Sequence, residues 1–208
     1  METDGPVLSG NHVRLEPLQR SHVGGLVAAA AGNSSLYQWS LVPQSEPAAR
    51  RYIDTALEWQ AAGTAVPFAT VLLESGAVIG STRFWKLERW SWPEAHPEFG
   101  RHVFDTCEIG HTWLTRSAIR TSANTEAKLL MLTYAFETWR VLRVCLHTDA
   151  RNQRSRVAIE RIGAQFEGIL RSHRMAADYT PRDSARFSIL ATEWPDVKQR
   201  LHDLLDRP

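Results

Sequence analysis

The chain has 208 residues, and its 24 Lys and Arg against 23 Asp and Glu leave a formal net charge of +1. This balance gives no general attraction to nucleic acid or to anionic lipid, so neither is an expected partner. With 43% apolar residues and no apolar run approaching the roughly 18 residues of a membrane-spanning helix, the composition excludes a membrane or disordered class.

The N-terminus, the cysteines and the histidines bear on compartment and metal content. Met1–Pro6 is polar and acidic, which argues against a signal peptide. Cys107 and Cys145 both fall on predicted strands and are expected to be buried thiols rather than a disulfide, as in a reducing, cytoplasmic compartment. The 8 histidines are scattered without metal-type spacing, so no metal site is expected. No repeat or linker divides the chain, and we expect one domain over residues 1–208.

The N-terminal half is predicted to form a strand, two helices and a hairpin of two strands, over residues 8–17, 21–31, 46–62, 67–74 and 77–86. Ser21 is the expected N-cap of the first helix. The second helix has apolar residues at three- and four-residue spacing and ends before Gly63. Ser75-Gly76 is a short hairpin turn between the two strands.

The segment after the hairpin, Leu87–Asp105, is irregular and rich in aromatic residues. Trp90 and Trp92 lie in it, close in sequence to Trp85, and the chain has 8 Trp in all. Such residues commonly patch the edge of a core. The alternative is an aromatic wall for a substrate pocket, and the sequence leaves both interpretations open.

The central segment Cys107–Gly163 is predicted to form strand, loop, helix, strand, loop and helix, over 107–114, 115–123, 125–138, 141–148 and, for the last helix, 152–162. Ser122 or Asn124 is the expected N-cap of its long helix. A loop that leads into a helix N-terminus presents unpaired N–H groups and is a ready anion site. Arg116 and Arg120 in this loop would add charge, although the local pattern alone favours an ordinary connection with solvated arginines.

The C-terminal segment is predicted to contribute two strands, over 164–175 and 186–191, and a helix over 195–206. Tyr179–Asp183 forms a turn between the strands, and Thr192 is the candidate cap of the helix. The complete order of elements indicates a mixed α/β sheet.

Several motifs of the chain resemble the GNAT acetyltransferases, and in particular the branch with the Rim-type ribosomal-protein N-terminal acetyltransferases. They are EIGHTW, NTEAK, AFE, the NQRSR run that continues to IERIGA, FEGILR and DSARFSIL. The resemblance extends from about His12 to the C-terminus and is strongest over Glu108–Arg171. It implies an α/β GNAT fold, with a mixed, mostly antiparallel sheet of about seven strands, splayed between strands 4 and 5, and about four to five helices.

The same resemblance implies acetyl-CoA as cosubstrate, without a metal. The family's pyrophosphate loop carries two glycines, and here Arg120 and Ser122 stand in their places, within Ser117–Ser122. The guanidinium and the hydroxyls could supply compensating donors. The coenzyme-binding residues implied by the resemblance are Ile109, Trp113, Leu114, Arg120, Thr121, Ser122, Asn124, Thr125, Asn152 and Ser155.

Glu108 is the first candidate for the base that takes a proton from the acceptor amine. His111 on the same strand and a water molecule are rivals, and a structural carboxylate paired with arginine is the alternative. The two side chains would face opposite sides of a regular strand, unless a bulge at Gly110 intervenes. The expected acceptor-binding residues are Trp39, Trp85, Trp90, Glu108 and His111.

Ser155 is the candidate acid that protonates the departing thiolate, as the resemblance implies. Asn152 lies on the same face of its helix and would bind the coenzyme or a water. Simple capping of the helix by Asn152 is the alternative.

Together these features predict an N-acetyltransferase in which a primary amine attacks acetyl-CoA directly in a ternary complex. The acceptor is either a protein N-terminus or a small amine. A catalytically inactive acyl-CoA-binding or sensory module is the alternative, suggested by the missing glycines. The sequence does not decide between a monomer and a homodimer.

Overall fold

The structure is a computed structural model that describes residues 5–32, 34–101 and 103–206, so the first residues of Met1–Pro6 lie outside it. The strands are β1 (Leu8–Ser9), β2 (Val13–Pro17), β3 (Ala65–Leu72), β4 (Val78–Glu88), β5 (Thr106–Leu114), β6 (Arg143–Asp149), β7 (Gln165–Met175) and β8 (Pro181–Leu190). The α-helices are α1 (Val23–Ala30), α2 (Glu46–Ala61), α3 (Ser122–Thr133), α4 (Gln153–Arg161) and α5 (Trp194–Leu205). None of the helices formed by these residues is long and apolar enough to cross a membrane.

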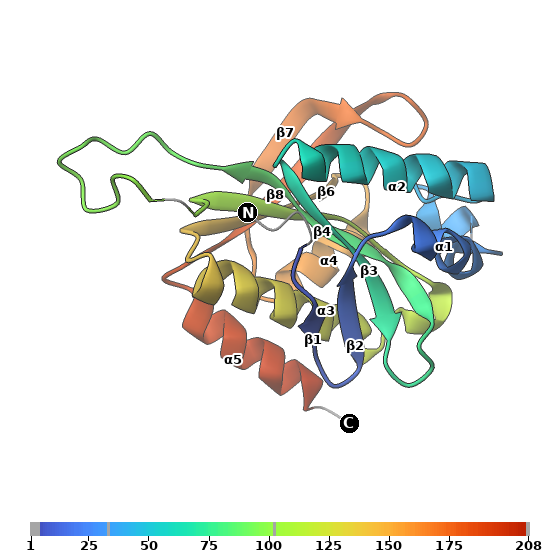
Figure 1. The fold of residues 1–208 in the computed structure, drawn as a ribbon. Helices are drawn as coiled ribbons and strands as arrows, with labels where there is room; N and C mark the ends of the chain where they lie inside the picture. The colour runs from blue at the N-terminus through green and yellow to red at the C-terminus, as the bar shows by residue number, and fades with distance from the viewer. Residues whose placement is uncertain (1–4, 33, 102, 207–208) are drawn as a thin grey trace.

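The strands form one sheet in the order β1-β2-β3-β4-β5-β6-β8-β7 (Figure 1). All neighbours are antiparallel except β5 and β6. That parallel pair runs only from Thr106↔Arg143 to Glu108↔Cys145, although β5 continues to Leu114 and β6 to Asp149. The predicted splay in the centre of the sheet is therefore confirmed, and β5 has an edge without a strand partner beyond Glu108.

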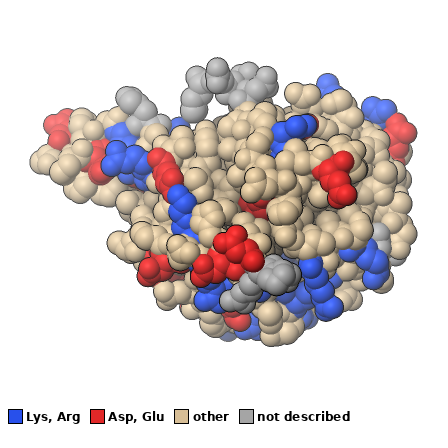
Figure 2. Space-filling model, turned by 90° about the horizontal axis from the view of Figure 1, so that it is seen from below, with Lys and Arg blue, Asp and Glu red and all other residues tan. Residues whose placement is uncertain are grey.

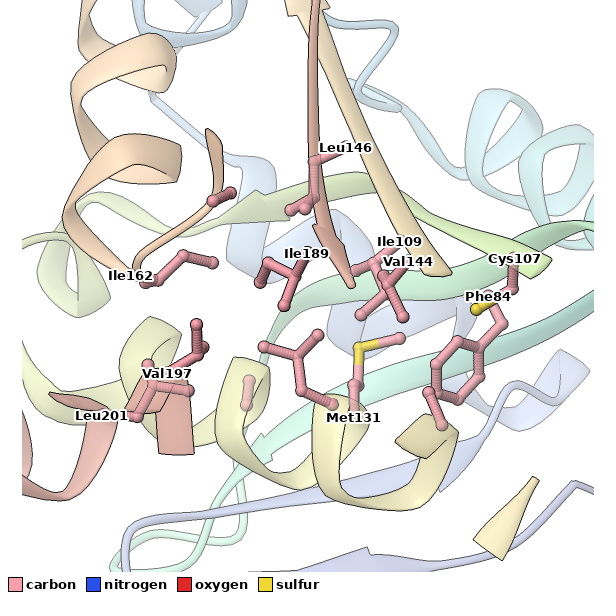
Figure 3. Packing of buried hydrophobic residues seen from close by; sticks show 14 of the residues in the cluster. Phe84, Cys107, Ile109, Met131, Val144, Leu146, Ile162, Ile189, Val197 and Leu201 are labelled. Carbon is pink, nitrogen blue, oxygen red and sulfur yellow. The ribbon is translucent and has the colours of Figure 1, made fainter. Parts of the chain in front are cut away.

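Helices cover both faces of the sheet. Adjacent residues of β3 divide the two cores, because Phe68 packs with residues of α3 and α5 whereas Ala69 packs with α1 and α2. Figure 3 shows the first core, in which side chains of α3 and α5 pack against strand residues; among those labelled are Met131, Val197, Leu201, Phe84, Ile109 and Val144. The free thiol of Cys107 lies buried in the same core, and Cys145 is also a free thiol.

The sheet has one strand more than the sequence suggested, because the predicted strand 8–17 is two strands that pair as a hairpin. Glu126 of α3 holds the turn between them: its carboxylate accepts N–H bonds of 2.7 Å from Asn11, His12 and Val13. At the other end of the chain, β8 is longer than predicted and pairs with both β6 and β7.

Three predicted helix caps are wrong. Ser21 lies inside a short 3-10 turn that precedes α1, so that His22 takes the N-cap position. Helix α3 begins at Ser122 and is capped by Thr121, whose hydroxyl oxygen accepts the N–H of Ala123, rather than by Ser122 or Asn124. The N-cap of α5 is Glu193, not Thr192.

The aromatic segment between β4 and β5 is irregular, as predicted, and projects away from the sheet (Figure 1). Asp105 holds its base, because its carboxylate accepts the Trp90 N–H at 2.7 Å and the Trp92 Nε1–H at 2.9 Å. On the face seen in Figure 2, basic and acidic side chains are both present and neither sign covers the surface, in line with the net charge of +1.

Candidate active site

A cavity of about 800 Å³ lies where β5 and β6 diverge. Its walls come from α2, β4, β5, α3, β6, α4, β7 and β8, so it is built from segments far apart in the sequence. Of the residues predicted for the site, the cavity is lined by Trp39, Trp85, Glu108, Ile109, His111, Trp113, Leu114, Arg120, Thr121, Asn124, Asn152 and Ser155. Ser122, Thr125 and Trp90 are not among the lining residues.

A β-bulge shapes the wall formed by β5. The register changes from Arg83↔Gly110 to Ser81↔Trp113, so β5 has one residue more than β4 over this stretch. His111 lies in the bulge with a left-handed φ of 52°, which is uncommon for a residue other than glycine. The bulge brings Glu108 and His111 into the same cavity, so the expectation for a regular strand, that they face opposite sides, does not hold.

Glu108 is buried, and its Oε2 atom accepts a 2.6 Å hydrogen bond from Arg174 Nη2. His147 Nδ1 lies 3.1 Å from the same oxygen, although neither ring nitrogen is aligned for a good hydrogen bond. Burial raises the pKa of Glu108, but His147 and Arg174 outweigh it and lower the pKa to about 2. The other oxygen, Oε1, is buried without a hydrogen-bond partner among the described residues.

His111 lies in an aromatic group with two tryptophans, at 4.7 Å from the Trp85 ring and 5.5 Å from the Trp59 ring. Its own side chain is accessible, because it faces the open cavity. Loss of hydration next to the surrounding protein is the larger cause that lowers the pKa of His111, and the nearby Arg83 charge lowers it further, to about 3. The ring is therefore neutral at pH 7.

The loop before α3 keeps a glycine-like backbone without its glycines. Arg120 adopts a left-handed φ of 64°, the conformation that glycine enters without steric cost. The Thr121 hydroxyl donates to Ala118 O at 2.8 Å and caps the helix. The first turn of α3, with its unpaired N–H groups, therefore lies at the cavity wall. Three residues around this turn line the cavity: Arg120, Thr121 and Asn124.

A second helix N-terminus, that of α4, faces the same cavity. Asn152 is the N-cap, and its Oδ1 accepts the backbone N–H of Ser155 at 3.1 Å. Ser155 lines the cavity, and the hydrogen bond that it forms with Asn152 uses its backbone N–H and not its hydroxyl. Capping by Asn152 and an available Ser155 hydroxyl are therefore compatible.

The three tryptophans predicted for the acceptor side separate into two groups. Trp39 and Trp85 line the cavity, and each carries a guanidinium on its face, Arg151 at 4.5 Å and Arg174 at 4.7 Å respectively. Trp90 lies on the projecting segment and is 47% exposed.

Sequence reasoning missed Lys128, Arg174, Arg182 and Tyr52, which also line the cavity. Lys128 is 5% exposed and donates from Nζ to Thr112 Oγ1 at 2.9 Å. Burial lowers its pKa to about 7. A lysine inside the apolar run of the predicted helix was the one signal that could have found it. The two arginines carry no such signal, because only the pairing of β7 with β8 brings them to the cavity.

The arrangement suits the binding of an elongated anion with a reactive carbonyl. Two helix N-termini offer N–H donors for phosphate and carbonyl oxygens. The free edge of β5 offers further N–H groups beyond Glu108. A carboxylate and a hydroxyl lie in the same cavity, and no group of His, Cys, Asp and Glu side chains among the described residues could hold a metal ion.

Comparison with known proteins agrees with this geometry. Residues 12–165 match the family model of the acetyltransferase (GNAT) domain. A search of curated protein sequences gives no significant match.

Solved structures with the same fold include three informative ones. A GCN5-related N-acetyltransferase from Brucella melitensis is 28% identical with a TM-score of 0.83, over 96% of this chain and 85% of that one. A protein from T. thermophilus, whose name proposes an acetyltransferase, is 32% identical with a TM-score of 0.79, over 99% and 100%. RimJ of Mycobacterium smegmatis in complex with CoA-disulfide is 18% identical with a TM-score of 0.75, over 97% and 93%, and shows likeness of fold alone.

Proposed function

We propose that this chain, which belongs to the GNAT acetyltransferase family, transfers the acetyl group of acetyl-CoA directly to a primary amine while both substrates are bound. The acceptor is a small amine or a protein N-terminus, and the reaction takes place in the cytoplasm as a single-domain activity. One observation carries the proposal: the parallel pairing of β5 and β6 stops at Glu108, and the resulting cavity brings together a carboxylate, a hydroxyl and two helix N-termini.

The residues present fit acetyl-CoA, which supplies an activated acyl thioester when bound. Arg120 and the first turn of α3 would hold the pyrophosphate by charge and by N–H groups. The left-handed backbone of Arg120 supports this role, because the loop keeps its shape without glycine. The free edge of β5 and its bulge would present N–H groups to the thioester carbonyl oxygen.

Glu108 would receive the amine. Its unpartnered Oε1 is an acceptor for an ammonium or amine N–H. Because the pKa of Glu108 is about 2, the carboxylate cannot retain a proton at pH 7 and would pass it to water. Its main contribution is then to orient the nitrogen, and an α-amine, with an ordinary pKa near 8, needs little further help.

Ser155 would act as the acid that protonates the departing thiolate. In the proposed step the amine nitrogen forms the C–N bond as the C–S bond breaks, and the Ser155 hydroxyl donates a proton to the thiolate. Water returns a proton to Ser155, so the amine's proton and the thiol's proton balance. The place of Ser155 in the cavity lining, where its bond to Asn152 uses the backbone N–H and not the hydroxyl, supports this role.

A thiol-release assay with acetyl-CoA tests the proposal. Small amines and N-terminal peptides are supplied in parallel, and mass spectrometry identifies the acetylated nitrogen. Release that depends on acceptor supports the enzyme. Tight acetyl-CoA binding without turnover of any amine would instead indicate an acyl-CoA-binding module, the alternative that the missing loop glycines suggest.

A further inference from the structure

The cavity is lined by a guanidinium, that of Arg182, which has no carboxylate partner among the described residues, and this feature narrows the chemical class of the acceptor amine. We propose that the acceptor amine also carries an oxyanion, a carboxylate or a phosphate, which binds to Arg182 at the β7–β8 end of the cavity. The inference rests on the proposed function, because it identifies the acceptor of that same reaction.

Arg182 is partly buried and lines the cavity. Within the described residues its side chain forms a single hydrogen bond, from Nε to the Ser184 hydroxyl at 3.2 Å. No ion pair to it forms within the described residues. Burial of its guanidinium lowers the pKa of Arg182, with a further contribution from the Arg174 charge. A desolvated guanidinium with free N–H donors favours a planar oxyanion, which it can bind through two bonds.

The carboxylates that interact with Arg182 are already paired with other arginines. Glu108 accepts from Arg174 at 2.6 Å. Asp149 accepts from Arg151 through both oxygens, at 2.9 and 2.8 Å. With these two carboxylates paired elsewhere, no ion pair within the described residues balances the charge of Arg182, and a ligand could do so.

Other cations strengthen the field at this end of the cavity. Arg174 is directly opposite Arg182 in the β7–β8 register, so both side chains lie on the same face of the hairpin. Arg83 is 1% exposed, stacks on Tyr52 at 4.9 Å, and has two buried nitrogens without a hydrogen-bond partner. Tyr52 itself lines the cavity, so the Arg83 charge lies just behind its wall.

The groups of opposite charge suit a zwitterion. Glu108 Oε1 is free to accept from the amine, while Arg182 is free to bind the anion. Both residues line the same cavity and interact electrostatically. An amino acid or an aminoalkyl phosphonate matches this pattern, whereas the N-terminus of a neutral peptide matches only the Glu108 half.

The test uses acceptors that share one skeleton: a free amino acid, its carboxamide, the corresponding aminoalkyl phosphonate and the amine without an anionic group. A neutral N-terminal peptide amide completes the set. Thiol release gives kcat/KM for each, corrected for the concentration of unprotonated amine. We expect an anionic member to exceed its neutral match by about tenfold to a hundredfold, and the carboxylate and phosphonate arms distinguish the two oxyanions.

Three variants locate the effect. Arg182→Gln should remove the preference by raising KM for the anionic acceptor, with no change in KM for acetyl-CoA. Arg182→Lys keeps the charge but loses the planar fork, and should retain only part of the preference, which provides a second reading if Arg182→Gln folds poorly. Arg171→Gln, at an exposed position on β7 outside the cavity lining, is the matched control and should behave as wild type.

The outcomes separate the two proposals. Equal or better turnover of neutral amines or peptide amides overturns the anionic acceptor and leaves acetyl transfer intact. If no acceptor turns over, the proposed function fails, and calorimetric binding of the same compounds decides the inference: loss of anion binding in Arg182→Gln supports it, and unchanged binding overturns it.

Discussion

Arg174 of β7 donates to Glu108 of β5 at 2.6 Å, and this bond connects two strands that do not pair in the sheet. Glu108 is the last residue of β5 that pairs with β6, opposite Cys145, so its buried carboxylate lies where the two strands begin to separate. His147 and Arg174 lower the pKa of the carboxylate and keep it ionised, and the bond from Arg174 fixes its orientation. A carboxylate of the cavity wall is thus also a structural link between β5 and β7.

Glu108→Gln should therefore lower stability in a pH-dependent way. The pKa of Glu108 is lowered from 4.5 to about 2, so its contribution is fully present above pH 4.5 and is lost as the pH falls toward 2. At pH 7 the variant leaves Arg174 unpaired and should lose about 3 kcal/mol in the free energy of unfolding.

Urea denaturation at several pH values checks this. Wild type should lose more stability than Glu108→Gln between pH 5 and 3, and the exposed-site control Glu74→Gln should follow wild type. Parallel stability curves for wild type and Glu108→Gln would contradict the assigned pKa.

The central fold could be predicted because its local signals agree with its tertiary environment. The run that became α3 is apolar and free of Gly and Pro, and Gly76 adopts the left-handed φ of 67° that a tight hairpin turn requires. The caps failed where neighbouring residues competed. Both Ser21 and Thr192 are good cap types, but each lies inside a short turn that shifts the helix start.

The sequence did not indicate those cavity residues that long-range contacts bring to the site. The family resemblance indicated Glu108 and Ser155, yet no local pattern indicated that Arg174 would reach Glu108, a contact that spans 66 positions. The bulge at His111 was foreseeable only as an alternative, because period-two reasoning assumes a regular strand. The left-handed conformation of Arg120 could not be predicted either, because residues other than glycine rarely adopt it.

Lys128→Met should raise stability at neutral pH. Burial lowers the pKa of Lys128 from 10.5 to about 7, so between these values the unfolded chain binds a proton that the folded chain does not. Wild-type stability therefore rises with pH across this window and carries the full penalty at pH 7. Urea denaturation at pH 7 and pH 9 should show the variant ahead by on the order of a few kcal/mol at pH 7, with a smaller lead at pH 9. An equal lead at both values would refute the lowered pKa.

Two substitutions of Arg120 distinguish the effect of its backbone conformation on stability from the effect of its side chain on acetyl-CoA binding. Arg120→Gly relieves the left-handed φ of 64°, so it should be more stable than Arg120→Ala by about 1 kcal/mol. Both variants remove the guanidinium and should reduce the rise in melting temperature that acetyl-CoA causes in wild type. An undiminished rise in either variant would exclude Arg120 as a pyrophosphate ligand.

Trp85 and Trp90 form a matched pair for the acceptor wall. Trp85 lines the cavity, whereas Trp90 lies on the projecting segment. Trp85→Leu should raise the acceptor KM by about tenfold and leave acetyl-CoA binding unchanged, while Trp90→Leu should change neither. Melting temperatures are measured alongside, because Trp85 also stacks on Trp59 at 5.4 Å. A loss of stability in Trp85→Leu with unaltered kinetics would assign the residue to packing.

Ser155→Ala tests the proposed acid with few structural side effects. The bond between Asn152 Oδ1 and residue 155 uses the backbone N–H, so the variant keeps the cap of α4 and should melt with wild type. Asn152→Ala instead removes the cap and should lose about 1 kcal/mol in the free energy of unfolding.

The kinetic effect of Ser155→Ala should be modest, because a thiolate, with a thiol pKa near 8.5, is a good leaving group. A positioned acid is worth about 10²–10⁴-fold in general, and we expect an effect at or below the low end of that range. Single-turnover kinetics, in which chemistry rather than product release limits the rate, should show a loss of roughly tenfold to a hundredfold in Ser155→Ala with unchanged acetyl-CoA binding. A wild-type rate in that regime would remove Ser155 from the proton transfer and leave it as a residue of the helix start.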